Sequence, residues 1–196
     1  MTKPPAGEPA PRPARRDVQR NLDALLTAAA EVFAAEGVDA PVRRITEKAG
    51  LGAGTLYRHF PQRSDLIVAV FRREADACID AAAALSAQYE PVEALTRWLQ
   101  RLTRFIATKR GLKAALHSGD PAYENLPAYF MQRFLPAIER LLDAAAASGD
   151  IRADITPYDL LRTMANIVDP DDDAYTQRMI TLLVDGLRYR TGATGR

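Results

Sequence analysis

The residues best suited to bind a charged partner lie between Gly50 and Arg63. This stretch opens with three closely spaced glycines and then combines aromatic, arginine and histidine side chains. An arginine carries a fixed positive charge and a planar fork of N–H donors, which suits phosphates and base edges. The pattern therefore indicates recognition of a polyanion.

Residues 53–60 are expected to form a two-turn helix, which Pro61 ends because the residue before a proline disfavours the α region. Leu56 and Phe60 are four residues apart, so they share one face and should anchor the helix. A nucleic acid would meet the opposite face, whose residues are Gly54, Thr55, Tyr57 and Arg58. Gly54 has no side chain to hold this face away from a partner.

Two further helices are predicted to position this short one. Apolar residues repeat at intervals of three and four over 22–33, and Gly37 ends that helix. A second helix is expected over 42–49, followed by the glycine turn. Two short helices joined by such a turn have the layout of a helix-turn-helix.

The rest of the chain also shows helical patterns and no convincing alternating strand pattern. The remaining helices are expected over 65–85, 91–106, 128–147, 157–168 and 172–189. We therefore predict an all-α protein of about nine helices. Its expected parts are a disordered, proline-rich arm (1–16), a three-helix domain that contains the helix-turn-helix (17–66) and a larger helical domain (67–196).

The formal net charge is only +1, but the charge is unevenly distributed. Residues 40–73 contain seven basic and two acidic side chains, a net charge of +5. A basic block on a nearly neutral protein favours a polyanion-binding module. A basic face that is merely solvated remains the alternative.

The sequence GLGAGTLYRHFP, residues 50–61, closely resembles the recognition-helix signature of the tetracycline-repressor (TetR) family. Upstream, Phe33, Gly37 and the run ITEKAG at 45–50 resemble the first two helices of the same family. The resemblance covers about residues 20–70, roughly a quarter of the chain.

The resemblance implies that residues 53–60 enter the major groove of double-stranded DNA. The expected DNA contacts are Thr46, Gly52, Ala53, Gly54, Thr55, Tyr57, Arg58, His59 and Arg63. Arg43 and Arg44 are added to them on charge alone. Gly52 and Ala53 replace larger residues common in the family, so phosphates and DNA shape should share the recognition. Packing inside the protein remains the alternative for Tyr57 and His59.

The resemblance also implies that residues 17–66 are a DNA-binding domain and that residues 67–196 are a second domain, which binds a small molecule and dimerises. Prolines interrupt an aromatic-rich region there, and kinked helices leave gaps. The expected pocket residues are Trp98, Leu102, Phe105, His117, Tyr123, Tyr129, Phe130, Phe134 and Met164. Ordinary core packing remains the alternative for each of them.

A single two-turn helix supplies few contacts, and a palindromic operator requires a two-fold protein. We therefore expect a homodimer formed by the last two helices. Its expected interface residues are Leu161, Met179, Leu182, Leu183, Gly186 and Leu187. The acidic run at 169–173 is interpreted as helix capping rather than a metal site.

Other classes of protein find little support. The sequence contains only two histidines and a single cysteine, and it shows no nucleophile elbow, phosphate loop or zinc spacing. We therefore expect no enzymatic activity, no metal site and no cofactor. No apolar run is long enough to span a membrane, and we expect a cytoplasmic location. The predicted function is a ligand-responsive, sequence-specific DNA-binding regulator that acts as a repressor. The alternative is a helical small-molecule-binding or interaction protein without specific DNA recognition.

Overall fold

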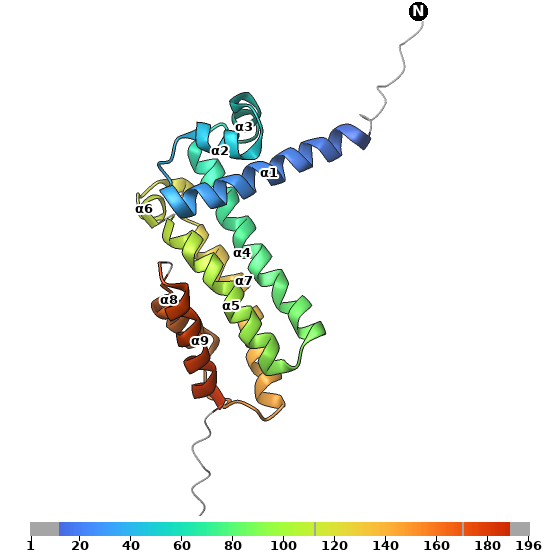
Figure 1. Cartoon of the computed structure of the whole chain (residues 1–196), viewed down its shortest axis with the longest axis vertical. Coiled ribbons are helices and arrows are strands. Elements are labelled where there is room, and N and C mark those ends of the chain that lie inside the picture. The colour runs from blue at the N-terminus through green and yellow to red at the C-terminus, as the bar shows by residue number, and fades with distance from the viewer. Residues whose placement is uncertain (1–11, 112, 170, 189–196) are drawn as a thin grey trace, which may run out of the picture.

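The computed structural model describes residues 12–111, 113–169 and 171–188, and all of its regular elements are helical (Figure 1). The helices are α1 (Arg12–Glu36), α2 (Val42–Ala49), α3 (Ala53–His59), α4 (Arg63–Gln88), α5 (Pro91–Gly111), α6 (Lys113–Leu116), the 3-10 turn η1 (Pro121–Tyr123), α7 (Leu126–Ala147), α8 (Pro157–Ile167) and α9 (Asp173–Arg188). The predicted all-α class is confirmed.

Glycines end the first two helices as the sequence indicated. Gly37 and Gly50 have φ angles of 81° and 66°, in the left-handed region that favours glycine. The N–H of Gly50 donates to the carbonyls of Glu47 and Thr46, which closes α2 before the turn to α3. Phe33 and Ile45 are fully buried, so α1 and α2 share one core.

The first helix begins earlier than expected. Residues 12–16, which we had assigned to a disordered arm, form the first turn of α1. Pro13 is compatible with this position because the first N–H groups of a helix have no partner inside it. Residues 1–11, the rest of the predicted arm, lie outside the described residues.

Helix α4 joins the helix-turn-helix to the rest of the molecule (Figure 1). Its first turn is held by a capping box in which Gln62 and Asp65 bind each other's backbone N–H groups. The helix then packs against α1, α5 and α7. The predicted domain boundary at 66/67 falls inside α4, so one continuous helix spans both parts.

The lower part of the molecule is a bundle of α4, α5, α7, α8 and α9 (Figure 1). Helix α7 continues through Pro136. The carboxylate of Asp172 accepts a 2.7 Å hydrogen bond from the N–H of Tyr175, so this part of the acidic run caps α9 as predicted. Within the described ranges, no cluster of histidine, cysteine or acidic side chains could hold a metal ion, and no helix could cross a membrane.

Candidate DNA-binding surface and ligand cavity

Helix α3 is held by the two apolar residues that its spacing singled out. Leu56 and Phe60 are 2% and 7% exposed, and both belong to the main hydrophobic core. The N–H of Phe60 donates to the carbonyl of Leu56 at 2.8 Å, which closes the helix before Pro61. The predicted anchoring face is therefore confirmed, and its position fixes the opposite face outward.

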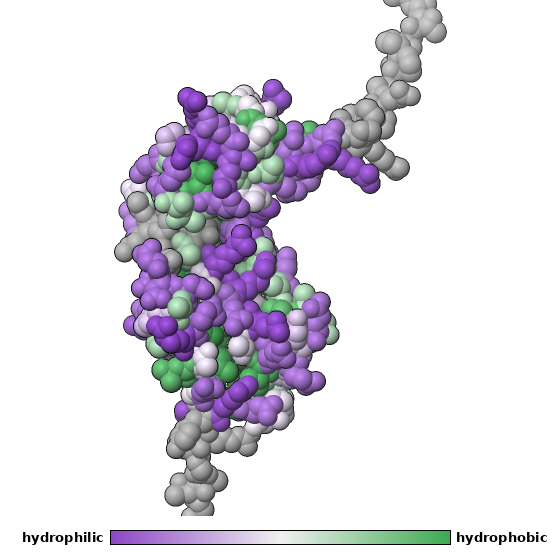
Figure 2. All heavy atoms as spheres, viewed as in Figure 1, coloured by the Kyte–Doolittle hydropathy of each residue, from purple (hydrophilic) through white to green (hydrophobic). Residues whose placement is uncertain are grey.

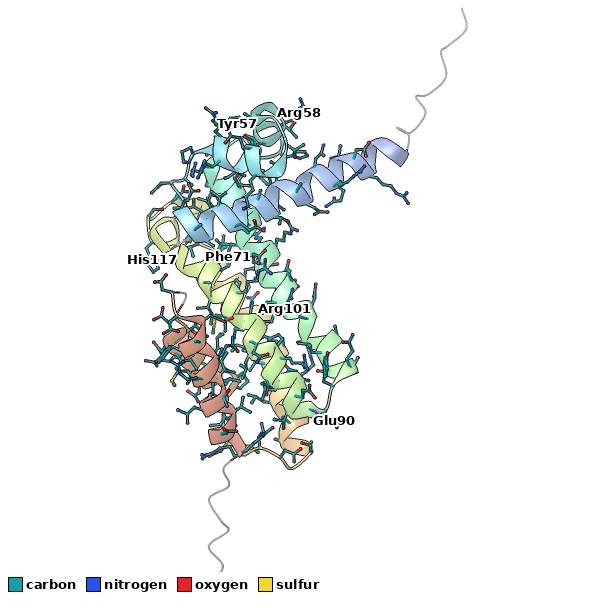
Figure 3. The ribbon with its side chains drawn as sticks, viewed as in Figure 1. Tyr57, Arg58, Phe71, Glu90, Arg101 and His117 are labelled. Atoms are coloured by element: carbon teal, nitrogen blue, oxygen red, sulfur yellow. The ribbon has the colours of Figure 1, made fainter. Side chains whose placement is uncertain are left out.

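The outward face of α3 is open. Figure 3 shows Tyr57 and Arg58 at the end of the molecule remote from the bundle, and Tyr57 is 53% exposed. Arg58 is exposed and has no hydrogen-bond or ion-pair partner among the described residues. Of the other residues predicted here, Gly52, Ala53 and Gly54 are exposed and Thr55 is half-buried.

Gly52 and Gly54 have no packing reason to be glycine. A Cβ atom placed on either residue would meet no other atom within 4 Å. Neither residue has a positive φ angle. The open space above them therefore leaves room for the close approach of another molecule.

The two arginines of α2 are exposed but already paired. Arg43 Nε donates to Glu47 at 2.6 Å, and Arg44 lies 3.3 Å from Glu36. The hydrogen bond to Glu47 raises the pKa of Arg43 further. Solvent screens exposed pairs of this kind, so a phosphate could replace the carboxylate at small cost.

Two expected DNA contacts are less accessible. Thr46 is only 5% exposed, and its hydroxyl donates to the carbonyl of Arg43 at 3.1 Å. His59 is half-buried, with its ring centroid 6.3 Å from that of Phe60. Thr46 therefore faces the interior of the helix-turn-helix, while His59 lies at the edge of the α3 surface.

Arg63 also differs from the expectation. Its guanidinium donates from Nε to the carbonyl of Val38 at 2.6 Å and from Nη2 to the carbonyls of Val38 and Ala40. It lies 5.8 Å from the centre of the Phe33 ring. The first residue of α4 thus holds the loop between α1 and α2, a role that sequence spacing did not reveal.

A cavity of about 480 Å³ lies between α4, α5, α6, α7 and α8. Of the expected pocket residues, Phe105, His117, Tyr123 and Phe130 line it. Several other residues that were not expected there also line the cavity, among them Phe71, Leu126, Met131, Tyr158, Leu161 and Arg162. Helical spacing does not show which face of a helix borders a gap, and of these residues only Leu161 had been named, as a dimer contact.

The other expected pocket residues lie elsewhere. Trp98, Leu102, Phe134 and Met164 are fully buried, and none of them lines the cavity. The indole N–H of Trp98 donates to a backbone carbonyl of α4 at 2.9 Å, which satisfies it inside the core. Tyr129 is only half-buried and donates to Asp76 of α4 at 2.8 Å. The four buried residues therefore belong to the core, as the alternative interpretation had it, and Tyr129 contacts α4 outside the cavity.

A second, more polar cavity of about 460 Å³ lies where the helix-turn-helix meets the bundle. Arg63 and Asp39 line it from one side, and Ser118, Asp120 and Tyr123 line it from the other. Tyr123 therefore borders both cavities. Burial raises the pKa of its hydroxyl, Asp120 raises it further, and Arg63 opposes both effects.

The expected interface residues on α8 and α9 divide into two groups. Leu161 and Leu187 are buried within the chain at 8% and 3% exposure. Leu182 is 65% exposed, Met179 and Leu183 are half-buried, and Gly186 is exposed with open space beside it. Met179, Leu182, Leu183 and Gly186 therefore lie on the accessible surface of α9, whereas Leu161 and Leu187 pack beneath it in the core.

Known proteins match both parts of the chain. Residues 25–70 match the bacterial regulatory proteins of the tetR family, and residues 90–189 match the C-terminal domain of SbtR-like transcriptional regulators. The crystal structure of the TetR transcriptional regulator SCO0520 from Streptomyces coelicolor is similar over 85% of this chain and 97% of that one, with 39% identity and a TM-score of 0.74. The chain belongs to the TetR family of transcriptional regulators.

Further relatives agree with this assignment. A TetR transcription regulatory protein from Mycobacterium vanbaalenii is 33% identical and has a TM-score of 0.73, with 90% of this chain and 100% of that one covered. An HTH-type transcriptional regulator of Staphylococcus aureus is 27% identical over 175 residues, which are 88% of this chain and 80% of its own length. The TetR-family protein described here is thus a DNA-binding transcriptional regulator rather than an enzyme.

Proposed function

We propose that this TetR-family protein is a homodimeric repressor that binds a palindromic operator and leaves it when a small molecule enters the larger cavity. The observation that carries the proposal is the open face of α3, where the side chains of Arg58 and Tyr57 project into solvent and are not needed for packing. A cytoplasmic location is part of the proposal, because the protein must reach the DNA.

On DNA, α3 lies in the major groove with its anchoring face towards α1 and α2. Arg58 offers the fork of donors that reads a guanine or grips a phosphate, and the Tyr57 hydroxyl reaches the backbone. The glycines and Ala53 contribute no polar side chain, so sequence-dependent DNA shape supplies part of the specificity.

Helices α8 and α9 form the dimer contact in this proposal. Figure 2 shows hydrophobic residues gathered over this part of the surface, and Leu182 is the most exposed of the large apolar side chains described. Gly186 costs about 1 kcal/mol relative to alanine within a helix, a cost that a close approach of two helices would offset. A two-fold axis there would set two copies of α3 one DNA turn apart, about 34–36 Å.

Repression ends when the ligand prefers a conformation with a different spacing of the two α3 helices. By linkage, the ligand lowers DNA affinity by the factor by which DNA lowers ligand affinity. Reversing a 99:1 population requires about 5.5 kcal/mol of differential binding. Tyr123 and Arg63 give a route for this coupling, because Tyr123 borders both cavities and Arg63 holds the α1–α2 loop.

The first test is an Arg58→Ala substitution. We expect it to weaken binding to the operator by about 1–3 kcal/mol, or roughly 5- to 150-fold, with little effect on a scrambled duplex. Fluorescence anisotropy with the DNA upstream of the protein's own gene, over a series of salt concentrations, measures both affinities.

The matched control is Arg140→Ala, which removes the same charge from an exposed site on α7. It should leave operator binding unchanged. Unchanged binding by Arg58→Ala would show that α3 is not the reading helix. Equal, weak binding of the unmodified protein to both duplexes and to other promoter regions would favour the alternative function, a helical small-molecule-binding protein without specific DNA recognition.

The dimer is tested by Leu182→Glu, which places a charge on the most exposed apolar residue of α9. We expect the dimer dissociation constant to rise by at least about 30-fold, since a buried charge would replace the most exposed large apolar side chain of the proposed contact. Sedimentation equilibrium measures it, with Val18→Glu on α1, 51% exposed, as the control. A dimer of unchanged affinity would place the interface elsewhere.

A further inference from the structure

The two nitrogen-bearing side chains that line the larger cavity lie at its solvent-exposed side, which we call its mouth. Phe71, Phe105 and Phe130, which line the inner wall, are buried at 2%, 2% and 6% exposure. His117 and Arg162 line the same cavity but are exposed to solvent. A molecule inside would therefore have an apolar body and a polar end that faces outward.

The inner wall suits a flat ring. The rings of Phe105 and Phe130 are stacked, with centroids 5.0 Å apart and an angle of 11° between their planes. Phe71 meets Phe105 edge to face at 5.4 Å and 64°. Aromatic faces and edges attract other rings at such distances. A volume of about 480 Å³ lies in the range of cavities that hold drug-sized ligands.

The charge at the mouth has one sign. Among the described residues that line the cavity, none is Asp or Glu, and Arg162 is the one with a permanent charge. The nearest acid along α8 is Asp159, which does not line the cavity and whose carboxylate accepts a 2.6 Å hydrogen bond from Thr156 at the start of the helix. A guanidinium stays protonated at any physiological pH, so the mouth favours an anion and disfavours a cation.

We propose that the effector is an aromatic or otherwise ring-bearing acid, whose apolar body lies against the three phenylalanines and whose anionic group is held by Arg162. This inference rests on the proposed function, since it describes the ligand of the same cavity. Arg162 acts as the specificity-determining residue, because it is the group that distinguishes an acid from a neutral molecule of the same shape. The planar fork of its donors suits a carboxylate or a sulfonate.

Two fluorescent probes of nearly the same shape test the proposal on the full-length protein. Anilinonaphthalene sulfonate is an anion, and phenylnaphthylamine is its neutral counterpart without the sulfonate. We expect the unmodified protein to bind the sulfonate at least about 10-fold more tightly than the neutral probe. Arg162→Gln should weaken binding of the sulfonate by about 10-fold and leave the neutral probe within about 2-fold.

Two control variants separate the outcomes. Arg140→Gln removes an equal charge from α7 and should change neither affinity, while Ala165→Phe fills an exposed edge of the cavity and should weaken binding of both probes. Equal affinities for the two probes, or no effect of Arg162→Gln, would overturn the inference and leave the cavity as the effector site. Binding of both probes that Ala165→Phe does not alter would overturn the effector site itself and the inference with it.

Discussion

A Gly54→Leu substitution is expected to lower operator affinity by about 10³-fold, to the level of non-specific binding. Gly54 lies on the outward face of α3, and in the proposed complex this face must approach the floor of the major groove. A leucine side chain there would hold the whole helix away and break every specific contact at once. The affinity is measured by anisotropy against the operator and a scrambled duplex.

Folding should not suffer, because a Cβ at Gly54 meets no atom of the protein within 4 Å. Replacing a helical glycine also adds up to about 1 kcal/mol of helix propensity. The thermal midpoint of the variant should therefore equal or exceed that of the unmodified protein. Ala84→Leu, which adds bulk at an exposed site on α4, serves as the control. Operator binding by Gly54→Leu at full strength would show that this face does not meet DNA.

Leu56→Ala, unlike Gly54→Leu, should act on folding, and we expect it to lower the free energy of unfolding by about 2–5 kcal/mol. Leu56 is 2% exposed, and it is the residue through which α3 packs on the core. Truncation would leave a cavity beneath a seven-residue helix that has few other contacts. Urea unfolding followed by circular dichroism measures the change.

The control for this substitution is Val18→Ala, at an exposed site on α1, which should stay within about 0.5 kcal/mol. The loss of operator binding by Leu56→Ala should follow the fraction of unfolded protein, and an excess of DNA that binds the folded state should restore part of it. A stability close to that of the unmodified protein would mean that Leu56 does not anchor α3.

The two faces of α3 were predictable because they depend on local geometry. Leu56 and Phe60 are one helical turn apart, and their shared burial decides where Arg58 points. Thr46 and Arg63 were less predictable, since their orientation depends on partners set by the tertiary fold. For Arg63 those partners are carbonyls of Val38 and Ala40, which are more than twenty residues away in the sequence.

The cavity shows a second limit of sequence patterns. Trp98, Phe105 and Phe134 belong to the aromatic-rich region in which the sequence analysis expected a pocket, and all three are buried. Only Phe105 borders the cavity, because a gap forms where neighbouring helices diverge and the spacing within one helix does not record that divergence. The same reason explains why Arg162, an exposed residue that follows two buried leucines in α8, was not singled out.

The cavity wall and the open face of α3 are formed by different residues, which has a consequence for how regulators of this kind diversify. The residues that line the ligand cavity and those on the open face of α3 have no member in common. Under the proposed function, substitutions around Phe130 or Arg162 should therefore change the inducer while the target promoter stays the same, and the reverse should hold at Arg58. Tyr123 borders both cavities, so a substitution there is expected to affect ligand binding and DNA binding together. A library built to obtain new biosensors from this protein should vary the cavity wall and keep Tyr123 fixed.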